Sequence, residues 1–246
     1  VPKDVTQAMA KFSYPQEDIF IRSYQPVVNG HTGQIKKAVQ MFASAKRPVV
    51  YFGGGIVLGN AAQELTDFVR MTGAPCVGTL MGLGAYPSSD RQFLGMLGMH
   101  GTYEANLAMQ NADVVLAVGA RFDDRVVSVP SKFLEKTKKI IHVDVDPSSI
   151  AKRVKVDIPI VGNVKNVLAE MNGLLSKRES AANRDGLDKW WKNIEKWRAR
   201  DCLWFDNDSE IIKPQYVVQK LAEVTGNSAI ITSDVGQHQM FAAQYY

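Results

Sequence analysis

The feature that most constrains this chain is a run of five apolar residues at 114–118 (VVLAV), which ends directly in a glycine. A continuous apolar run of this length is typical of a strand buried on both faces of a parallel sheet. Four charged side chains follow within 121–125 (RFDDR). Because ligands of open α/β sheets bind at the carboxyl ends of strands, this segment is a candidate binding loop. Composition alone leaves open a solvated loop with internal ion pairs.

Similar apolar runs alternate with helical patterns along residues 29–175. The expected strands lie at 49–52, 74–77, 114–118, 140–143 and 158–161, and the apolar run at 114–118 is the third of them. Segments with apolar residues at helical spacing lie at 31–45, 61–71, 102–110 and 164–175. Alternating strands and helices, joined by right-handed crossovers, predict an α/β fold with a doubly wound, Rossmann-like parallel sheet.

The flanking segments predict other units. Residues 1–28 contain scattered prolines and are expected to be the end of a preceding domain and a connector. Residues 176–204 read as a linker and a charged helix, whose tryptophans are expected to pack on a neighbouring domain. Residues 205–246 are expected to begin a second α/β domain, with a strand at 229–232 (AIIT). A start on Val indicates a mature product or a fragment.

Composition excludes several classes of protein. The 246 residues carry a net charge of only +4, which gives no reason to expect a nucleic-acid partner. No apolar run reaches the length of a membrane span, so no membrane partner is expected. Cys76 and Cys202 lack the spacing of metal ligands, and free thiols predict a cytoplasmic protein.

Two further strand ends are candidates for ligand contact. Three glycines at 53–55 follow the first strand, but Leu58 breaks the spacing of the dinucleotide fingerprint. These glycines either allow a ligand to approach the backbone or form a tight turn with positive φ. An acidic pair at 144–146 ends another strand, where a carboxylate either accepts from a ribose hydroxyl or caps a helix starting at Ser148.

Three segments together resemble the catalytic subunit of acetohydroxyacid synthase, also called acetolactate synthase. They are 97–101 (LGMHG), 119–126 (GARFDDRV) and 233–240 (SDVGQHQM), and the segments 1–5, 79–82 and 142–146 fit the same family. The resemblance covers nearly the whole chain in order. It implies an enzyme that decarboxylates pyruvate and adds the two-carbon unit to pyruvate or 2-ketobutyrate, in branched-chain amino-acid biosynthesis. It also implies thiamine diphosphate, Mg²⁺, and an FAD that performs no net redox chemistry.

The resemblance implies specific contacts. For FAD in the central domain they are Gly53, Gly54, Gly55, Thr79, Leu80, Met81, Leu97, Met99, His100, Gly119, Arg121, Asp123, Arg125, Val126, Asp144 and Val145. For thiamine diphosphate they are Val235, Gly236, Gln237 and His238. For the substrate channel they are Met99, Asp124 and Arg125, whose guanidinium suits a planar carboxylate.

The family's catalytic glutamate and its metal motif match nothing in this sequence. We therefore expect residues 1–246 alone to be inactive, with no catalytic residue and no metal ligand set of their own. The resemblance further implies a homodimer or tetramer and a small regulatory subunit. The alternative is a non-catalytic nucleotide-binding middle module of another thiamine-diphosphate enzyme, such as glyoxylate carboligase or pyruvate oxidase.

Overall fold

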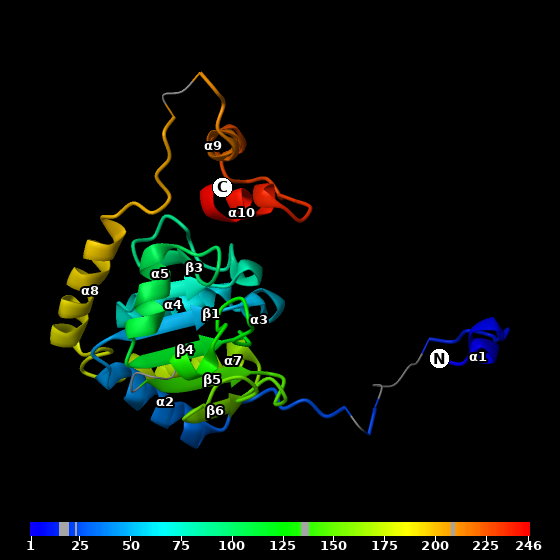
Figure 1. Ribbon diagram of the computed structural model, residues 1–246. Helices are drawn as coiled ribbons and strands as arrows, with labels where there is room; N and C mark the ends of the chain where they lie inside the picture. Colours follow the sequence, from blue (N-terminus) through cyan, green and yellow to red (C-terminus); the bar gives the residue numbers. More distant parts are fainter. Residues whose placement is uncertain (15–19, 23, 134–137, 208–209) are drawn as a thin grey trace.

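The computed structural model describes residues 1–14, 20–22, 24–133, 138–207 and 210–246. Strands in these residues form one six-stranded parallel sheet with the order β3-β2-β1-β4-β5-β6 (Figure 1). The strands are β1 (Pro48–Phe52), β2 (Cys76–Gly78), β3 (Phe93–Met96), β4 (Val114–Val118), β5 (Lys139–Asp144) and β6 (Ile158–Val161). The order reverses between β1 and β4, as in a Rossmann fold, so the predicted fold class is confirmed.

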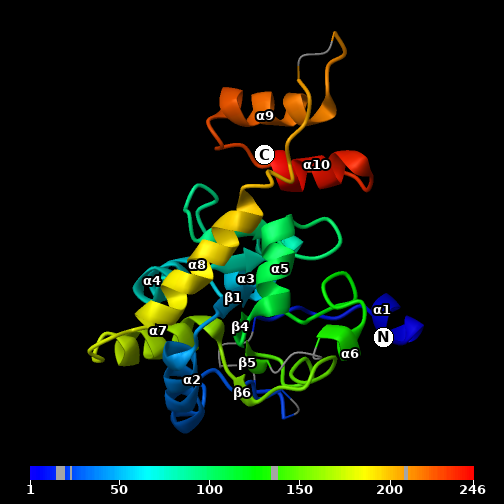
Figure 2. The same cartoon turned by 60° about the vertical axis from the view of Figure 1, so that its left-hand side comes forward.

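Helices cover both faces of the sheet. One face packs against α2 (Thr32–Ser44), α4 (Ala62–Thr72) and α7 (Val164–Leu175). The other packs against α5 (Tyr103–Asn111) and α8 (Arg184–Arg198), which lie side by side in Figure 2. The remaining helices are α1 (Lys3–Gln7), α3 (Gly54–Leu58), the 3₁₀ helix η1 (Leu80–Gly82), α6 (Pro130–Phe133), α9 (Pro214–Thr225) and α10 (Gln237–Tyr245).

Strand β1 shows why the strands read as unbroken apolar runs. Val50 and Phe52 belong to the core beneath α2, α4 and α7, whereas Val49 and Tyr51 belong to the core beneath α5 and α8. Successive side chains of a strand point to opposite faces. Every position is therefore buried when helices cover both faces.

Helix α8 packs on this same sheet through its tryptophans. The indole Nε1 of Trp190 donates to the Pro48 carbonyl oxygen at 3.1 Å, and that of Trp191 donates to the Gly73 carbonyl oxygen at 2.9 Å. The apolar face predicted for this helix is thus buried, and its three lysines are exposed. Arg198 instead donates to the carbonyl oxygens of Arg91 and Phe93. The domain boundaries given above stay predictions, but the core of the sheet includes α8.

Several elements differ from the sequence-based expectation. Strand β3 was not predicted from the sequence. It is short and contains Gly95 at φ +95°, and its one partner in the described sheet is β2. Helix α3 was also missed because it has only five residues. The strand expected at 229–232 is wrong: no described strand pairs with it, and the Ile230 side chain is 93% exposed. A strand is stable only when it forms backbone hydrogen bonds with a neighbouring strand, and this apolar run has none among the described residues.

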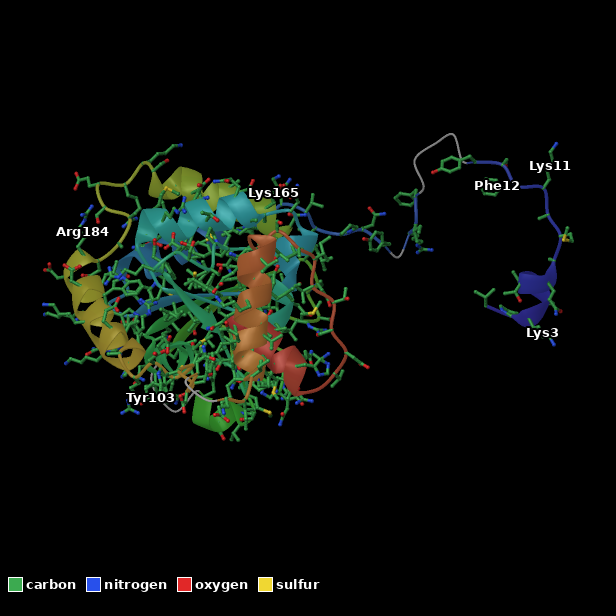
Figure 3. The ribbon with its side chains drawn as sticks, turned by 90° about the horizontal axis from the view of Figure 1, so that it is seen from above. Lys3, Lys11, Phe12, Tyr103, Lys165 and Arg184 are labelled. Carbon is green, nitrogen blue, oxygen red and sulfur yellow. The ribbon has the colours of Figure 1, made fainter. Side chains whose placement is uncertain are left out.

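The amino-terminal segment is separate from the packed body. Figure 3 shows Lys3, Lys11 and Phe12 on a stretch that extends away from the sheet and its helices. Its described side chains are exposed, and it contains the short helix α1. The connector expected there stays a prediction. Among the described residues, no helix is both long enough and apolar enough to cross a membrane.

The indole contacts of α8 generate a stability prediction. Trp190→Ala should lower the free energy of unfolding by about 3–5 kcal/mol, because it leaves a cavity in the core and an unpaired Pro48 carbonyl. Urea unfolding measures the change. Trp204→Ala is the matched control, since Trp204 is 71% exposed and should change stability little. Equal losses in the two variants would contradict this role of α8.

Candidate functional site

All sixteen residues that the resemblance assigns to FAD lie at one edge of the sheet. They sit at or directly after the carboxyl ends of β1, β2, β3, β4 and β5. Because these strands are parallel, their carboxyl ends share the same edge. The edge includes the switch point between β1 and β4, where ligands of open α/β sheets bind. The fold thus brings together residues that are up to 92 positions apart, from Gly53 to Val145.

Glycines join the loops after β1 and β4. The amide of Gly53 donates to the Val118 carbonyl oxygen at 3.1 Å, and the amide of Gly55 donates to the Gly119 carbonyl oxygen at 3.1 Å. A Cβ on Gly55 would lie 2.5 Å from the Gly119 Cα. Gly53 has a φ of −132°, so the tight-turn alternative with positive φ fits Gly119 (φ +58°) instead. Two of the three glycine amides are therefore used inside the fold.

Phe122 anchors the charged loop after β4. Its side chain is buried against the rings of Tyr51, Phe133 and His142, with centroid distances of 5.1, 6.0 and 5.4 Å. Its φ of +52° is unusual for a bulky residue and costs about 1–3 kcal/mol, which the aromatic burial offsets. The charged neighbours on both sides of Phe122 remain exposed. Sequence reasoning assigned no role to Phe122, although one aromatic residue among four charges was a signal.

His142, on β5, is hydrogen-bonded to the same loop. Its Nε2 lies 2.8 Å from the Ala120 carbonyl oxygen, which can only accept, so Nε2 carries the proton. Its Nδ1 is buried and has no partner among the described residues. Burial lowers the pKa of His142, while the nearby Asp144 charge opposes this shift. The ring is therefore neutral at pH 7 and acts as a hydrogen-bond donor.

The loops after β3 and β4 also meet. The Met99 amide donates to the Arg125 carbonyl oxygen at 3.1 Å, and a Cβ on Gly98 would lie only 2.5 Å from that oxygen. The side chains of Met99 and Arg125 are both exposed. Two of the three predicted channel residues are thereby brought together from separate motifs. The third, Asp124, is exposed on the same turn.

The acidic segment after β5 folds as a turn. Asp146 accepts hydrogen bonds from the Ser148 amide, the Ser148 hydroxyl and the Ser149 hydroxyl, and the Ser148 bonds are the main reason that its pKa is lowered. No helix forms at Ser148, so the carboxylate caps a turn instead of the expected helix. Asp144 accepts from the Asp146 amide at 2.9 Å and is largely buried at the edge.

The four residues expected at thiamine diphosphate lie in a different part of the structure. They precede and begin α10, where Gly236 is the N-terminal cap and Val235 is highly exposed. The opposite end of α10 reaches the carboxyl edge, because Gln244 Nε2 donates to the His100 carbonyl oxygen at 2.9 Å. The last turn of α10 therefore contacts the loop after β3, and the four residues of the motif lie at the other end of this helix.

The carboxyl edge fits a flavin dinucleotide in some respects only. Exposed Arg121 and Arg125 are suitable donors for a diphosphate, and exposed Leu80, Met81 and Met99 offer apolar surface for flat rings. Helix α3 is a weaker diphosphate site than the dinucleotide motif provides, because of its length and its occupied glycine amides. Two surface hollows, beside Arg70 and beside Trp197, lie away from this edge.

Comparisons with known proteins agree with the motifs. Residues 35–171 match the family described as thiamine pyrophosphate enzyme, central domain. The chain is 50% identical to the acetolactate synthase isozyme 3 large subunit of Escherichia coli, which it matches over 100% of its own length and 43% of the relative's. An acetolactate synthase large subunit of Haemophilus influenzae is 49% identical, with the same coverage. An acetolactate synthase of Mycobacterium leprae is 42% identical over all of this chain and 39% of the relative.

The chain spans less than half the length of these curated relatives. The match nevertheless covers 100% of this chain, so it spans every segment that suggested the resemblance. The comparisons therefore confirm the resemblance inferred from the sequence.

The buried His142 makes stability depend on pH. Its pKa lies below the ordinary value of 6.5 in the folded state, so the unfolded chain binds more protons as the pH falls below 6.5. The free energy of unfolding should therefore decrease as the pH falls through 6.5, and it should be nearly constant well above that value. The carboxyl groups with lowered pKa, such as Asp157, titrate below 3.8 and lie outside this window.

Urea unfolding across this range measures the effect. His142→Gln keeps an amide donor for Ala120 but cannot titrate, so its stability should vary less with pH. His31→Gln replaces an exposed histidine and should keep the full pH dependence. The same dependence in both variants would contradict the role of His142.

Proposed function

We propose that this chain, which belongs to the family of thiamine pyrophosphate enzyme central domains, is the middle part of an acetolactate synthase catalytic subunit. The complete enzyme would decarboxylate pyruvate and condense the two-carbon unit with pyruvate or 2-ketobutyrate, as a transferase of branched-chain amino-acid biosynthesis. The observation that carries the proposal is that two of the three motifs, 97–101 and 119–126, meet at one sheet edge. A chain-long identity of 50% to a relative of that name adds support.

We assign the carboxyl edge to FAD. Arg121 and Arg125 would neutralise the diphosphate, and the backbone around Gly54 and Gly119 would lie close to the dinucleotide. Met81 and Met99 would lie against its flat rings, since both side chains are exposed and polarisable. Asp144 would accept from a ribose hydroxyl. The flavin would supply no net electrons to the reaction; its contribution is to order these loops.

Arg125 has a second role in this proposal. Its guanidinium would hold the carboxylate of the second 2-keto acid through two parallel hydrogen bonds, a geometry that lysine cannot reproduce. Met99 lies beside it through the contact of the two backbones. Asp124 would border the same entrance and repel a carboxylate that approached the wrong side. One loop would then serve both the flavin and the substrate.

We propose the remaining partners from the resemblance and from the relatives' names. Val235, Gly236, Gln237 and His238 would contact the diphosphate of thiamine diphosphate, whose Mg²⁺ ligands we expect outside this sequence. Relatives described as large subunits favour a small regulatory partner. We also propose a homodimer or tetramer of catalytic subunits in the cytoplasm. Glyoxylate carboligase and pyruvate oxidase, the alternatives, are not favoured by the relatives' names.

The flavin assignment is testable by titration. Arg121→Ala should weaken binding of FAD to residues 1–246 by about tenfold, because one charge-assisted hydrogen bond to a diphosphate is lost. Quenching of flavin fluorescence measures the dissociation constant. Arg178→Ala is the control, since Arg178 is an exposed arginine after α7, at the opposite edge of the sheet. Absence of FAD binding by the unsubstituted chain would reject the assignment.

The double role of Arg125 gives a separate prediction. In the complete enzyme, Arg125→Ala should raise the KM for 2-ketobutyrate by a larger factor than it raises the dissociation constant of FAD. Arg125→Lys keeps the charge but loses the planar fork, and should recover only part of the substrate affinity. Steady-state kinetics and flavin titration on the same preparations measure both quantities. Equal losses would reject the division between Arg121 and Arg125.

A further inference from the structure

Asn106, on α5, holds Gly98 with both groups of its side-chain amide. The Gly98 amide donates to Asn106 Oδ1 at 3.0 Å, and Asn106 Nδ2 donates to the Gly98 carbonyl oxygen at 3.0 Å. An amide presents a donor and an acceptor on one planar group. A carboxylate offers acceptors only, and an apolar side chain of similar size offers neither. Asparagine is therefore suited to this double contact, which we call the Asn106 clamp.

The clamp determines how closely two loops approach. Gly98 has a φ of +104°, a conformation that other residues rarely adopt. A Cβ at this position would also lie 2.5 Å from the Arg125 carbonyl oxygen. The next amide along the chain, that of Met99, donates to this same oxygen at 3.1 Å. Holding Gly98 in place thus holds Met99 against the backbone of Arg125.

The helix that carries the clamp is firmly fixed. Ala105, Ala108 and Met109 of α5 are buried in the core of the sheet. The N-cap residue Thr102 accepts from the Ala105 amide at 3.2 Å and donates its hydroxyl to the Leu94 carbonyl oxygen at 2.5 Å. Helix α5 is therefore tied to β3 and to the sheet, and it provides a rigid base for Asn106.

The turn on the other side is held by its own backbone. The Asp123 carbonyl oxygen accepts from the amides of Val126 and Val127 at 3.1 and 2.8 Å. This arrangement closes the turn around Arg125 and leaves the Arg125 carbonyl oxygen free to accept from Met99. The Asn106 clamp is consequently a short path from a rigid helix, through Gly98 and Met99, to the turn that carries Arg125.

We infer that Asn106 is a positioning residue that holds Met99 and Arg125 side by side at the carboxyl edge. It acts through the backbone of Gly98 and touches neither the substrate nor the flavin. The side chains of Met99 and Arg125 are exposed, and the hydrogen bond that joins the two residues is made by their backbones. The consequence for catalysis rests on the proposed function, in which these two side chains border the site of the second 2-keto acid.

The test is Asn106→Asp in the complete enzyme. The carboxylate still accepts from the Gly98 amide but repels the Gly98 carbonyl oxygen, so half of the clamp is lost. We expect the KM for 2-ketobutyrate to rise about tenfold with little change in kcat. The Met99 amide should also exchange with solvent deuterium faster, because its bond to Arg125 is no longer held.

Asn111→Asp is the matched control. Asn111 lies on the same helix, and its Nδ2 donates to the Leu107 carbonyl oxygen at 2.8 Å, away from the Gly98 loop. The substitution removes that bond and places a negative charge at the carboxyl end of α5, so it lowers stability. It should leave the KM and the exchange of Met99 unchanged. A merely structural role for Asn106 predicts the same behaviour in both variants.

The outcomes separate the inference from the proposed function. Faster Met99 exchange together with a raised KM in Asn106→Asp alone supports the inference. Unchanged Met99 exchange overturns it, and so does an unchanged KM despite faster exchange. If the unsubstituted enzyme formed no acetolactate, the proposed function would fail. The inference would then be decided by Met99 exchange and by FAD affinity in the two variants.

Discussion

The contact between the loops after β1 and β4 is the interaction on which the rest of the edge depends. Gly55 donates to Gly119 where the sheet reverses its order, and the two backbones are too close for any side chain between them. This contact joins the two loops at the point where the strand order reverses, and the chain turns at Gly119, which has a φ of +58°. The charged loop, its buried phenylalanine and the neighbouring loops are all arranged around that turn.

The strained backbone of Phe122 determines that the charged side chains of this loop are exposed. Phe122 adopts a left-handed conformation because its ring packs among Tyr51, Phe133 and His142. With the ring inside, the residues on either side must face solvent. Neutral His142 reinforces the arrangement by donating to Ala120. A pair of arginines is thus exposed at the edge through apolar burial, and among the described residues no salt bridge holds either of them.

The same edge shows how a structural cofactor and a reaction centre share one loop. In the proposed enzyme, Arg121 faces the flavin and Arg125 faces the second keto acid, so ordering of one would order the other. The Asn106 clamp adds a fixed reference on α5, which itself belongs to the core. The positions of Met99 and Arg125 then depend on a helix packed on the sheet, although both residues lie on loops.

The sequence by itself determined the doubly wound fold, because apolar runs and helical spacing are local patterns. It also determined the candidate edge, since parallel strands end together. Only the tertiary structure decided the place of β3, which is defined by its pairing with β2, and the absence of a strand at 229–232, which lacks a neighbour. The tertiary structure likewise decided the roles of Gly55 in joining two loops, of Phe122 in anchoring the charged loop, and of Asn106 in holding Gly98. Gly55 and Phe122 depend on partners far along the chain, and Asn106 depends on a left-handed turn at Gly98 that its helical pattern does not encode.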